Sequence, residues 1–217
     1  MKLALMSDTH GMLSDPVSLG GAEAIIHAGD VGVDRKPEEW MFKEFYLWAM
    51  KVSIPIFMTW GNHDFIGQRA SYGVWDALPD NVHILVDEAV EIGGKQFWFS
   101  PWSPTFFNWA FMKDENQLAD IYAEIPEDTQ ILVSHTPPFG KGDRVYNDGA
   151  VSNVGSTTLL YRIEHLPALE MVVCGHIHGG RGTYKIKRDG LSDVIVENVS
   201  LVNEAYKPVF TPVIMEI

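Results

Sequence analysis

The 217-residue sequence predicts a mixed α/β fold in which two β-sheets pack on each other and helices cover the outer faces. Three observations support this prediction. Short apolar runs alternate with a helical pattern at the start of the chain, short strands with a hairpin signal follow from residue 82, and the C-terminal end has the pattern of a meander. The sequence contains no internal repeat or linker-like stretch, so we expect a single domain over residues 1–217.

The N-terminal part of the chain begins with strand and helix signals in alternation. Residues 2–7 and 24–28 are short apolar runs, typical of strands that are buried on both faces. Residues 37–51 carry aromatic and aliphatic side chains at three-to-four spacing, with two glutamates near the start, which predicts an amphipathic helix. Residues 54–60 are rich in apolar side chains and predict the next strand.

The remaining elements are short strands and two further helices. Residues 114–125 have a helical pattern, and Ser156 is placed to cap a helix over residues 157–165. Gly93 and Gly94 mark a hairpin turn. The other predicted strands are residues 82–86, 89–92, 96–100, 131–134, 171–174, 183–187, 191–197 and 208–216.

The composition is that of a soluble globular protein with an excess of acidic residues. Hydrophobic residues make up 46% of the chain and charged residues 21%, which excludes a disordered chain. The 29 acidic and 16 basic residues give a net charge of −13, and a field of this sign disfavours nonspecific binding to nucleic acid. A phosphate ester is still compatible with this charge, because bound cations reverse the sign of a site locally.

The sequence carries no signal for a membrane or for export. No apolar run reaches the ~18 residues of a membrane span, and Asp8 interrupts the first apolar stretch too early for a signal peptide. The single cysteine, Cys174, excludes an internal disulfide, is best interpreted as a small buried strand residue, and is typical of a reducing compartment. We therefore expect a cytoplasmic protein without membrane association. The oligomeric state is open, with a homodimer as one option.

Five short polar clusters each follow a predicted strand. In open α/β sheets the carboxyl ends of separate strands converge, and ligands bind there. Together the clusters provide two candidate carboxylate ligands, one carboxamide and five imidazoles. They are Asp8-Thr9-His10, Gly29-Asp30, Gly61-Asn62-His63-Asp64, Ser134-His135 and Gly175-His176-Ile177-His178.

These residue types are typical of a site for two metal ions. Asp8 and His10, like His176 and His178, are two residues apart, so in an extended segment both side chains of each pair face the same side. Mixed oxygen and nitrogen ligation suits Zn, Mn, Fe, Ni or Co and disfavours Ca, for which oxygen ligands dominate. Two divalent ions held by two carboxylates leave a charge of about +2, or about +1 with a bridging hydroxide, and attract a phosphate ester.

Each cluster alone has an ordinary explanation. A histidine at a strand end is usually a surface or core residue, and Gly-Asp is a common turn dipeptide. Gly-His-X-His and Gly-Asn-His-Asp are much rarer by chance, and all five clusters occur at strand ends. The prediction of a metal centre therefore depends on the complete set.

With these five blocks, the sequence resembles the calcineurin-like metallophosphoesterase superfamily. The pattern of that family is Asp-X-His, Gly-Asp, Gly-Asn-His-Asp/Glu, a lone His and Gly-His-X-His, and the resemblance spans nearly the whole chain without a departure at a ligand position. It implies a four-layer αββα sandwich of two mixed sheets flanked by helices. It also implies two divalent metal ions, with Mn favoured in vitro.

The resemblance assigns a role to each clustered residue. It implies that one metal is held by Asp8, His10, Asp30 and His178. It implies that the other is held by Asp30, Asn62, His135 and His176, so that Asp30 bridges the two. His63 would face the substrate and stabilise phosphoryl oxygens or protonate the leaving group. Asp64 is a second catalytic candidate as the partner of a histidine, and a helix cap is the alternative.

Further stretches resemble one branch of the superfamily. Residues 100–104, 108–111, 135–140 and 198–200 are similar to the small phosphodiesterase-like branch that includes the brain metallophosphoesterase-domain proteins. Some members carry glycine where this chain has His176, which weakens their metal site, so the resemblance implies full activity here.

That branch implies a phosphodiesterase for small phosphodiesters, cyclic nucleotides among them. The reaction would be attack by a metal-bridging hydroxide. A phosphomonoesterase or protein phosphatase would share the same metal centre, and a metal-binding regulatory protein without turnover is the non-enzymatic alternative.

Four residues outside the clusters are candidates for substrate contacts. Trp102 and Phe107 follow a strand end, where they could border the site and stack on a base, although most aromatic residues of this stretch are expected in the core. Arg144 and Arg181 are candidates for phosphate contacts, and the alternative for both is a solvated surface arginine.

Overall fold

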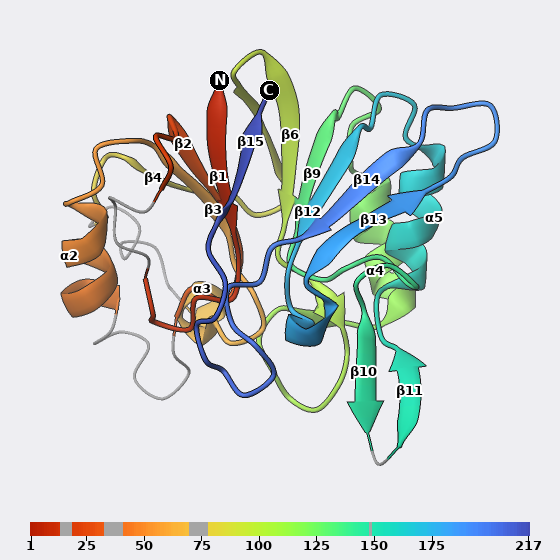
Figure 1. The fold of residues 1–217 in the computed structure, drawn as a ribbon. Coiled ribbons are helices and arrows are strands. Elements are labelled where there is room, and N and C mark those ends of the chain that lie inside the picture. The colour runs from red at the N-terminus through yellow and green to blue at the C-terminus, as the bar shows by residue number, and fades with distance from the viewer. Residues whose placement is uncertain (14–18, 33–40, 70–77, 148) are drawn as a thin grey trace.

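Two β-sheets lie face to face in the structure, a computed structural model that describes residues 1–13, 19–32, 41–69, 78–147 and 149–217 (Figure 1). The first sheet has the order β15 (Val213–Glu216), β1 (Lys2–Met6), β2 (Ala24–Ala28), β3 (Ile56–Thr59) and β4 (Val82–Ile84). The second has the order β13 (Gly182–Ile186), β14 (Val194–Asn198), β12 (Met171–Cys174), β9 (Ile131–Ser134), β6 (Lys95–Ser100) and β5 (Glu88–Ile92).

Both sheets are mixed. In the first, β1 to β4 run parallel and β15 pairs antiparallel with β1. In the second, β14, β12, β9 and β6 run parallel, while the edge strands β13 and β5 are antiparallel to their neighbours. The carboxyl ends of the parallel strands therefore lie at one edge of each sheet.

The core between the sheets is formed by alternate residues of the buried strands. Leu3 and Leu5 of β1 lie in it together with Phe97 and Phe99 of β6. Because successive strand residues face opposite sides, Met6 belongs instead to the cluster on the helix side of the first sheet. Strands buried on both faces need apolar residues at every position, which explains the continuous apolar runs in the sequence.

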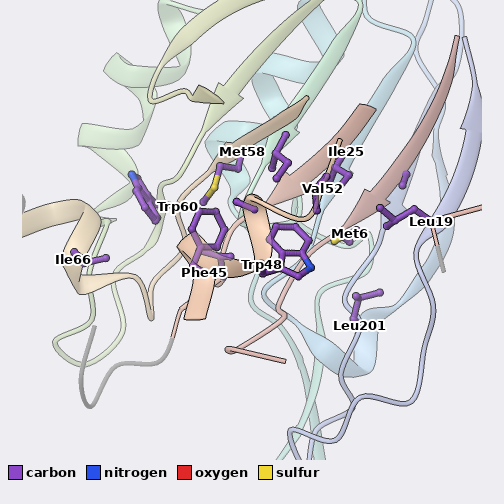
Figure 2. Packing of buried hydrophobic residues seen from close by; sticks show 14 of the residues in the cluster. Met6, Leu19, Ile25, Phe45, Trp48, Val52, Met58, Trp60, Ile66 and Leu201 are labelled. Atoms are coloured by element: carbon purple, nitrogen blue, oxygen red, sulfur yellow. The ribbon is translucent and has the colours of Figure 1, made fainter. Parts of the chain in front are cut away.

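Helices cover the outer faces and complete four layers. A π-helical turn at Met41–Phe45 continues into α2 (Tyr46–Ala49), whose side of the first sheet is filled by Phe45 and Trp48 with Ile25 and Met58 (Figure 2). On the second sheet, α4 (Glu115–Ala123) and α5 (Thr157–His165) bury Leu118, Leu159 and Ile163 in a separate cluster. The predicted αββα architecture is confirmed.

Hydrogen bonds at the helix ends match the expected signals. The Ser156 hydroxyl accepts from the Leu159 N–H at 3.1 Å, as predicted for the cap of α5. The Glu115 carboxylate accepts from the Thr157 and Thr158 N–H groups at 3.0 and 3.1 Å, so α4 also holds the start of α5. Within the described ranges, no helix combines the length and apolar character that a membrane crossing needs.

Some elements differ from the prediction. The start of the expected helix 37–51 lies outside the described residues, and its described part ends at Ala49. The predicted strand 208–216 is confined to β15. The segment before β15 instead accepts a hydrogen bond from Arg181, whose guanidinium also packs on it. A short helix, α3 (Phe65–Arg69), and a two-residue ribbon of β7 (Ser103–Pro104) with β8 (Met112–Lys113) were not predicted.

A hairpin of β10 (Arg144–Asn147) and β11 (Ala150–Asn153) was also not predicted, and it extends from the body of the molecule (Figure 1). All four residues of β11 are exposed, so this strand has no buried face and leaves no apolar alternation in the sequence.

Candidate metal centre

The five polar clusters meet at one edge of the two sheets, where backbone hydrogen bonds join them. The N–H of Asp8 donates to the Gly29 carbonyl at 2.9 Å, and the N–H of His10 donates to the Asp30 carbonyl at 3.0 Å. The N–H of Gly175 donates to the His135 carbonyl at 3.1 Å, so the second sheet is joined in the same way. The parallel strands therefore fix the ligand loops relative to one another.

The glycines of the clusters are required by close approach. A Cβ atom at Gly61 would lie 2.3 Å from the Asp30 Oδ1 and 2.5 Å from the His135 Cε1. A Cβ atom at Gly175 would lie 2.1 Å from the Ser7 Oγ and 2.3 Å from the Asp8 Oδ2. Any larger residue at either position would displace a candidate ligand.

The backbone turns sharply at four of the candidate ligands. Asp8, His10, Asp30 and His176 have φ values of 55°, 43°, 56° and 66°. The left-handed region is unfavourable for residues other than glycine, and such conformations concentrate at functional sites. These turns direct the four side chains toward a common point beyond the strand ends.

The first group of ligand atoms comes from Asp8, His10 and His178, each of which offers one atom that lies within 4.8 Å of the other two. The Nε2 atoms of His10 and His178 are 3.2 Å apart, and the Nε2 of His178 is 3.6 Å from the Asp8 Oδ1. Asp8 is held in place because both of its oxygens accept from the His176 N–H at 3.0 Å.

The second group comes from Asp30, His135 and His176, again within 4.8 Å. The Nε2 of His135 lies 3.5 Å from the Asp30 Oδ2 and 3.0 Å from the Asn62 Oδ1. The other ring nitrogen, Nδ1, lies 2.9 Å from the Ala28 carbonyl and donates to it, which leaves Nε2 as the nitrogen that can bind a metal once it has lost its proton.

Asp30 lies between the two groups. Its Oδ2 lies 3.9 Å from the His10 Nε2 and 3.5 Å from the His135 Nε2. Its Oδ1 accepts from the His63 N–H at 2.8 Å, which fixes the carboxylate. A single oxygen of Asp30 therefore faces the ligands of both groups, as expected for a bridging residue.

The charges of the site favour cations. Burial works against the ionised form of Asp8, but the hydrogen bond and charge of His178 outweigh it and lower its pKa to about 2. Burial opposes protonation of His135, yet the charge of Asp30 raises its pKa to about 9. Burial lowers the pKa of His176 to about 3, so this imidazole is neutral and able to ligate. Two ionised carboxylates attract positive charge to the place where the imidazole nitrogens converge, and the donor set fits a pair of divalent metal ions.

His63 lies beside both groups, and one of its ring nitrogens is within 4.8 Å of ligand atoms of His10 and Asp30. Its ring centroid is 4.8 Å from that of His10, at an interplanar angle of 86°, and 4.4 Å from that of Trp109. The partly exposed imidazole borders a cavity of about 510 Å³ that also reaches Asp30, Asn62 and His176. His63 is therefore placed to meet a molecule that enters from the cavity.

A family model supports the same interpretation. The model for calcineurin-like phosphoesterases matches residues 1–180. The chain belongs to this family. The family and the two ligand groups support a dinuclear divalent metal centre and a hydrolase that acts on phosphate esters.

Known proteins are similar to this calcineurin-like phosphoesterase over nine tenths or more of its length. Metallophosphoesterase domain-containing protein 1 of Homo sapiens is 30% identical over 241 residues, which cover 100% of this chain and 71% of the human protein. The structure of TT1561 from Thermus thermophilus superposes with a TM-score of 0.60 at 16% identity, over 95% of this chain and 96% of that one. A dimetal phosphatase from Danio rerio superposes with a TM-score of 0.51 at 11% identity, over 92% and 88% of the two chains. At these identities the solved structures confirm the fold.

In this calcineurin-like phosphoesterase, Asp64 joins two ligand loops. Its buried carboxylate accepts from the N–H groups of Gly32 and Gly61, both at 2.8 Å, and of Val31 at 3.3 Å. These bonds tie the loop after β2 to the loop after β3. Among the residues that the structure describes, no hydrogen bond joins the Asp64 carboxylate to a histidine or to the start of α3. We therefore propose that Asp64 is a positioning residue rather than a catalytic one.

A further buried group, His27, supports the same loops. The Gly29 N–H donates to the Nδ1 of His27 at 3.2 Å, so the proton of the neutral ring is on Nε2. That nitrogen lies 3.0 Å from the Thr9 Oγ1, and the Thr9 hydroxyl lies 3.3 Å from the Val31 carbonyl. The ring therefore links the backbone beside Asp8 and His10 to the backbone beside Asp30.

The four candidate substrate contacts lie in different surroundings. Phe107 borders the cavity and is 90% exposed. Trp102 lies among core residues, and its indole N–H donates to the Asp87 carboxylate at 2.6 Å. Arg181 donates to the carbonyls of Ser200 and Thr211 and joins two C-terminal loops instead. Arg144 is exposed on β10, and its neighbour Val145, rather than Arg144, lines the cavity.

Tyr206 is a cavity residue that the sequence analysis missed. It lines the cavity beside His63 and His178, and it follows β14 in a loop without any motif. No local pattern distinguishes it from other exposed tyrosines, so only the folded chain places it at the site.

Proposed function

We propose that the protein is a dinuclear metal-dependent phosphodiesterase that hydrolyses small phosphodiesters, cyclic nucleotides among them. The observation that carries this proposal is the chemistry of the cavity beside the ligands. Its outer walls are aromatic and aliphatic, formed by Phe106, Phe107, Trp109, Val145, Val154 and Tyr206. Among the described lining residues none is a lysine or arginine.

This lining suits a diester better than a monoester. A phosphodiester carries one negative charge and two organic groups, whereas a monoester carries close to two charges at neutral pH and one organic group. Apolar walls on more than one side accommodate organic groups. Because the described lining contains no lysine or arginine, it has no cationic side chain to balance the second negative charge of a monoester. The volume of about 510 Å³ is in the range of small-molecule sites.

The candidate ligands would hold the metals in the two groups that share Asp30. Bound there, two divalent ions would activate a water and stabilise charge on the attacked phosphate. His63 would contact a phosphoryl oxygen or donate a proton to the leaving oxygen, because its imidazole borders both the ligands and the cavity. Trp109 packs on the ring of His63 and limits its orientation.

The test compares a diester with a monoester that has the same leaving group. The purified protein is supplied with Mn²⁺, and kcat/KM is measured for bis(4-nitrophenyl) phosphate and for 4-nitrophenyl phosphate. We expect a ratio about tenfold or more in favour of the diester, because a tenfold preference corresponds to only about 1.4 kcal/mol. Asp30→Ala, measured in parallel, controls for a contaminating phosphatase.

Two results would contradict the proposal. A preference for the monoester would identify a phosphomonoesterase with the same centre. Absence of turnover with Mn, Fe, Ni, Zn and Co, on both esters, would instead favour a metal-binding regulatory protein.

A further inference from the structure

Tyr206 lies against three imidazoles that come from three different clusters. Its ring centroid is 4.9 Å from that of His10 and 4.9 Å from that of His178, at interplanar angles of 63° and 87°. The ring of His63 lies 6.0 Å away at 69°. Tyr206 therefore borders the ligands of one metal group and the residue that faces the cavity.

The loop holds Tyr206 in an unusual conformation. Its φ is 55°, in the left-handed region that residues other than glycine rarely adopt. The side-chain oxygen of Asn203 accepts from the N–H groups of Ala205 and Lys207, both at 3.0 Å. The Tyr206 N–H donates to the Asn203 carbonyl at 2.8 Å, so Asn203 fixes both sides of the turn. Strained residues that the surrounding structure holds in place are typical of functional sites.

The ring of Tyr206 is well placed to cover part of a ligand. Although its ring lies against partly buried imidazoles, the residue is 48% exposed and lines the cavity. Phe106 occupies a comparable place beside His176, with ring centroids 5.6 Å apart, and Trp109 does so beside His63. Three aromatic rings thus lie against the imidazoles of the site, and all three border the same cavity.

We propose that Tyr206 is a specificity-determining residue whose ring packs against the organic group of the bound phosphate ester. This inference rests on the proposed function, because it assumes that the phosphate group lies at the imidazoles and carboxylates. The organic group must then project into the cavity, where the surface beside the site is aromatic. An aromatic group would gain most from this contact.

The experiment separates contact with the organic group from support of the metal ligands. The probes are phenylphosphonate, whose P–C bond resists hydrolysis, and inorganic phosphate. Binding of each to the Mn²⁺-loaded protein is measured by calorimetry for the wild type, Tyr206→Phe and Tyr206→Ala. Tyr161→Ala is the matched control, since Tyr161 lies on α5, is 65% exposed and packs on a histidine, His165, outside the clusters.

We expect Tyr206→Ala to weaken the binding of phenylphosphonate about tenfold and that of phosphate less than about twofold, because stacking on one aromatic ring has an effect of this size. Tyr206→Phe should retain both affinities, and Tyr161→Ala should change neither. With bis(4-nitrophenyl) phosphate, Tyr206→Ala should raise KM with little change in kcat.

Three binding results would overturn the inference. An equal loss of affinity for both probes in Tyr206→Ala would show that Tyr206 only supports the metal-binding residues. Unchanged affinity for both probes would exclude a contact with the organic group. A wild type with no preference for phenylphosphonate over phosphate would also contradict it. Absence of diester turnover by the wild type would refute the proposed function alone, since the ratio of the two affinities does not depend on turnover.

Discussion

Gly175→Ala tests whether the glycines of the clusters exist to let the ligands approach. The added Cβ would lie 2.3 Å from the Asp8 Oδ2, 2.1 Å from the Ser7 Oγ and 2.6 Å from the Ser7 Cβ. Ordinary contact begins at 3.4 Å, so the Asp8 oxygen would have to retreat by 3.4 − 2.3 = 1.1 Å. Rotation of the Ser7 hydroxyl relieves only one of these contacts, and the backbone of β1 or β12 must therefore move.

The displacement should lower three measurable quantities: the stability, the turnover and the metal affinity. Overpacking at a buried position costs about 1–3 kcal/mol of unfolding free energy. A shift of about 1 Å at a reacting centre costs about 10²-fold in turnover. Metal affinity should fall about 10–100-fold, as when a group that orients a ligand is lost. Urea unfolding, elemental analysis after dialysis and diester hydrolysis measure the three quantities.

Gly94→Ala separates this clash from simple backbone strain. Gly94 has a φ of 80° but no atom within 4 Å of an added Cβ, so alanine there introduces strain without contact. This variant should lose about 1 kcal/mol of stability and keep its metals and turnover. If Gly175→Ala retained wild-type metal content and undiminished turnover, the argument from close approach would be refuted.

Three further predictions test the individual roles. His63→Ala should keep its metal content while turnover falls by about 10²–10⁴-fold, and loss of metal would identify His63 as a ligand. Asn62→Ala should reduce the metal content from two ions toward one, because the Asn62 Oδ1 lies 3.0 Å from the Nε2 of His135, a member of the second group. If elemental analysis found both ions retained, this prediction would be contradicted. Burial lowers the pKa of His27 to about 4 from 6.5, so the unfolded chain takes up the proton first and stability falls as the pH decreases through this window. His27→Leu should be less stable by about 2 kcal/mol at neutral pH. Its free energy of unfolding, measured by urea titration, should also fall less steeply between these pH values than that of the wild type. An unchanged pH dependence would contradict the buried neutral ring.

The parts of the fold that the sequence predicted are those whose residues are fixed by local requirements. β1 and β12 are buried on both faces, so their residues had to be apolar at successive positions. The clusters after them were visible because close approach requires glycine and because ligation requires a few residue types. The cap of α5 at Ser156 was predictable for the same reason, since one short polar side chain accepts from a free N–H group of the first helical turn, that of Leu159.

The parts that were missed depend on partners distant in the sequence. Trp102 has the appearance of a cavity residue, but Asp87 binds its indole N–H from 15 residues away. Arg181 has the appearance of a phosphate contact, but its guanidinium bonds two carbonyls of the C-terminal loops. Asp64 resembles a catalytic acid or a cap until the loops after β2 and β3 come together around it. In each case the side chain is engaged by a group that no local pattern reveals.

The distribution of backbone strain connects the fold to metal binding. Among the described non-glycine residues with positive φ, four are candidate ligands, and Phe107 and Tyr206 line the cavity. Each left-handed turn costs about 1–2 kcal/mol, and the carboxylates of Asp8 and Asp30 repel each other within the same site. Packing of the two sheets must offset these costs in the metal-free chain, whereas cations would remove the repulsion and bind all four strained ligands at once. Metal binding should therefore stabilise the strand-end loops more than the sheets that carry them.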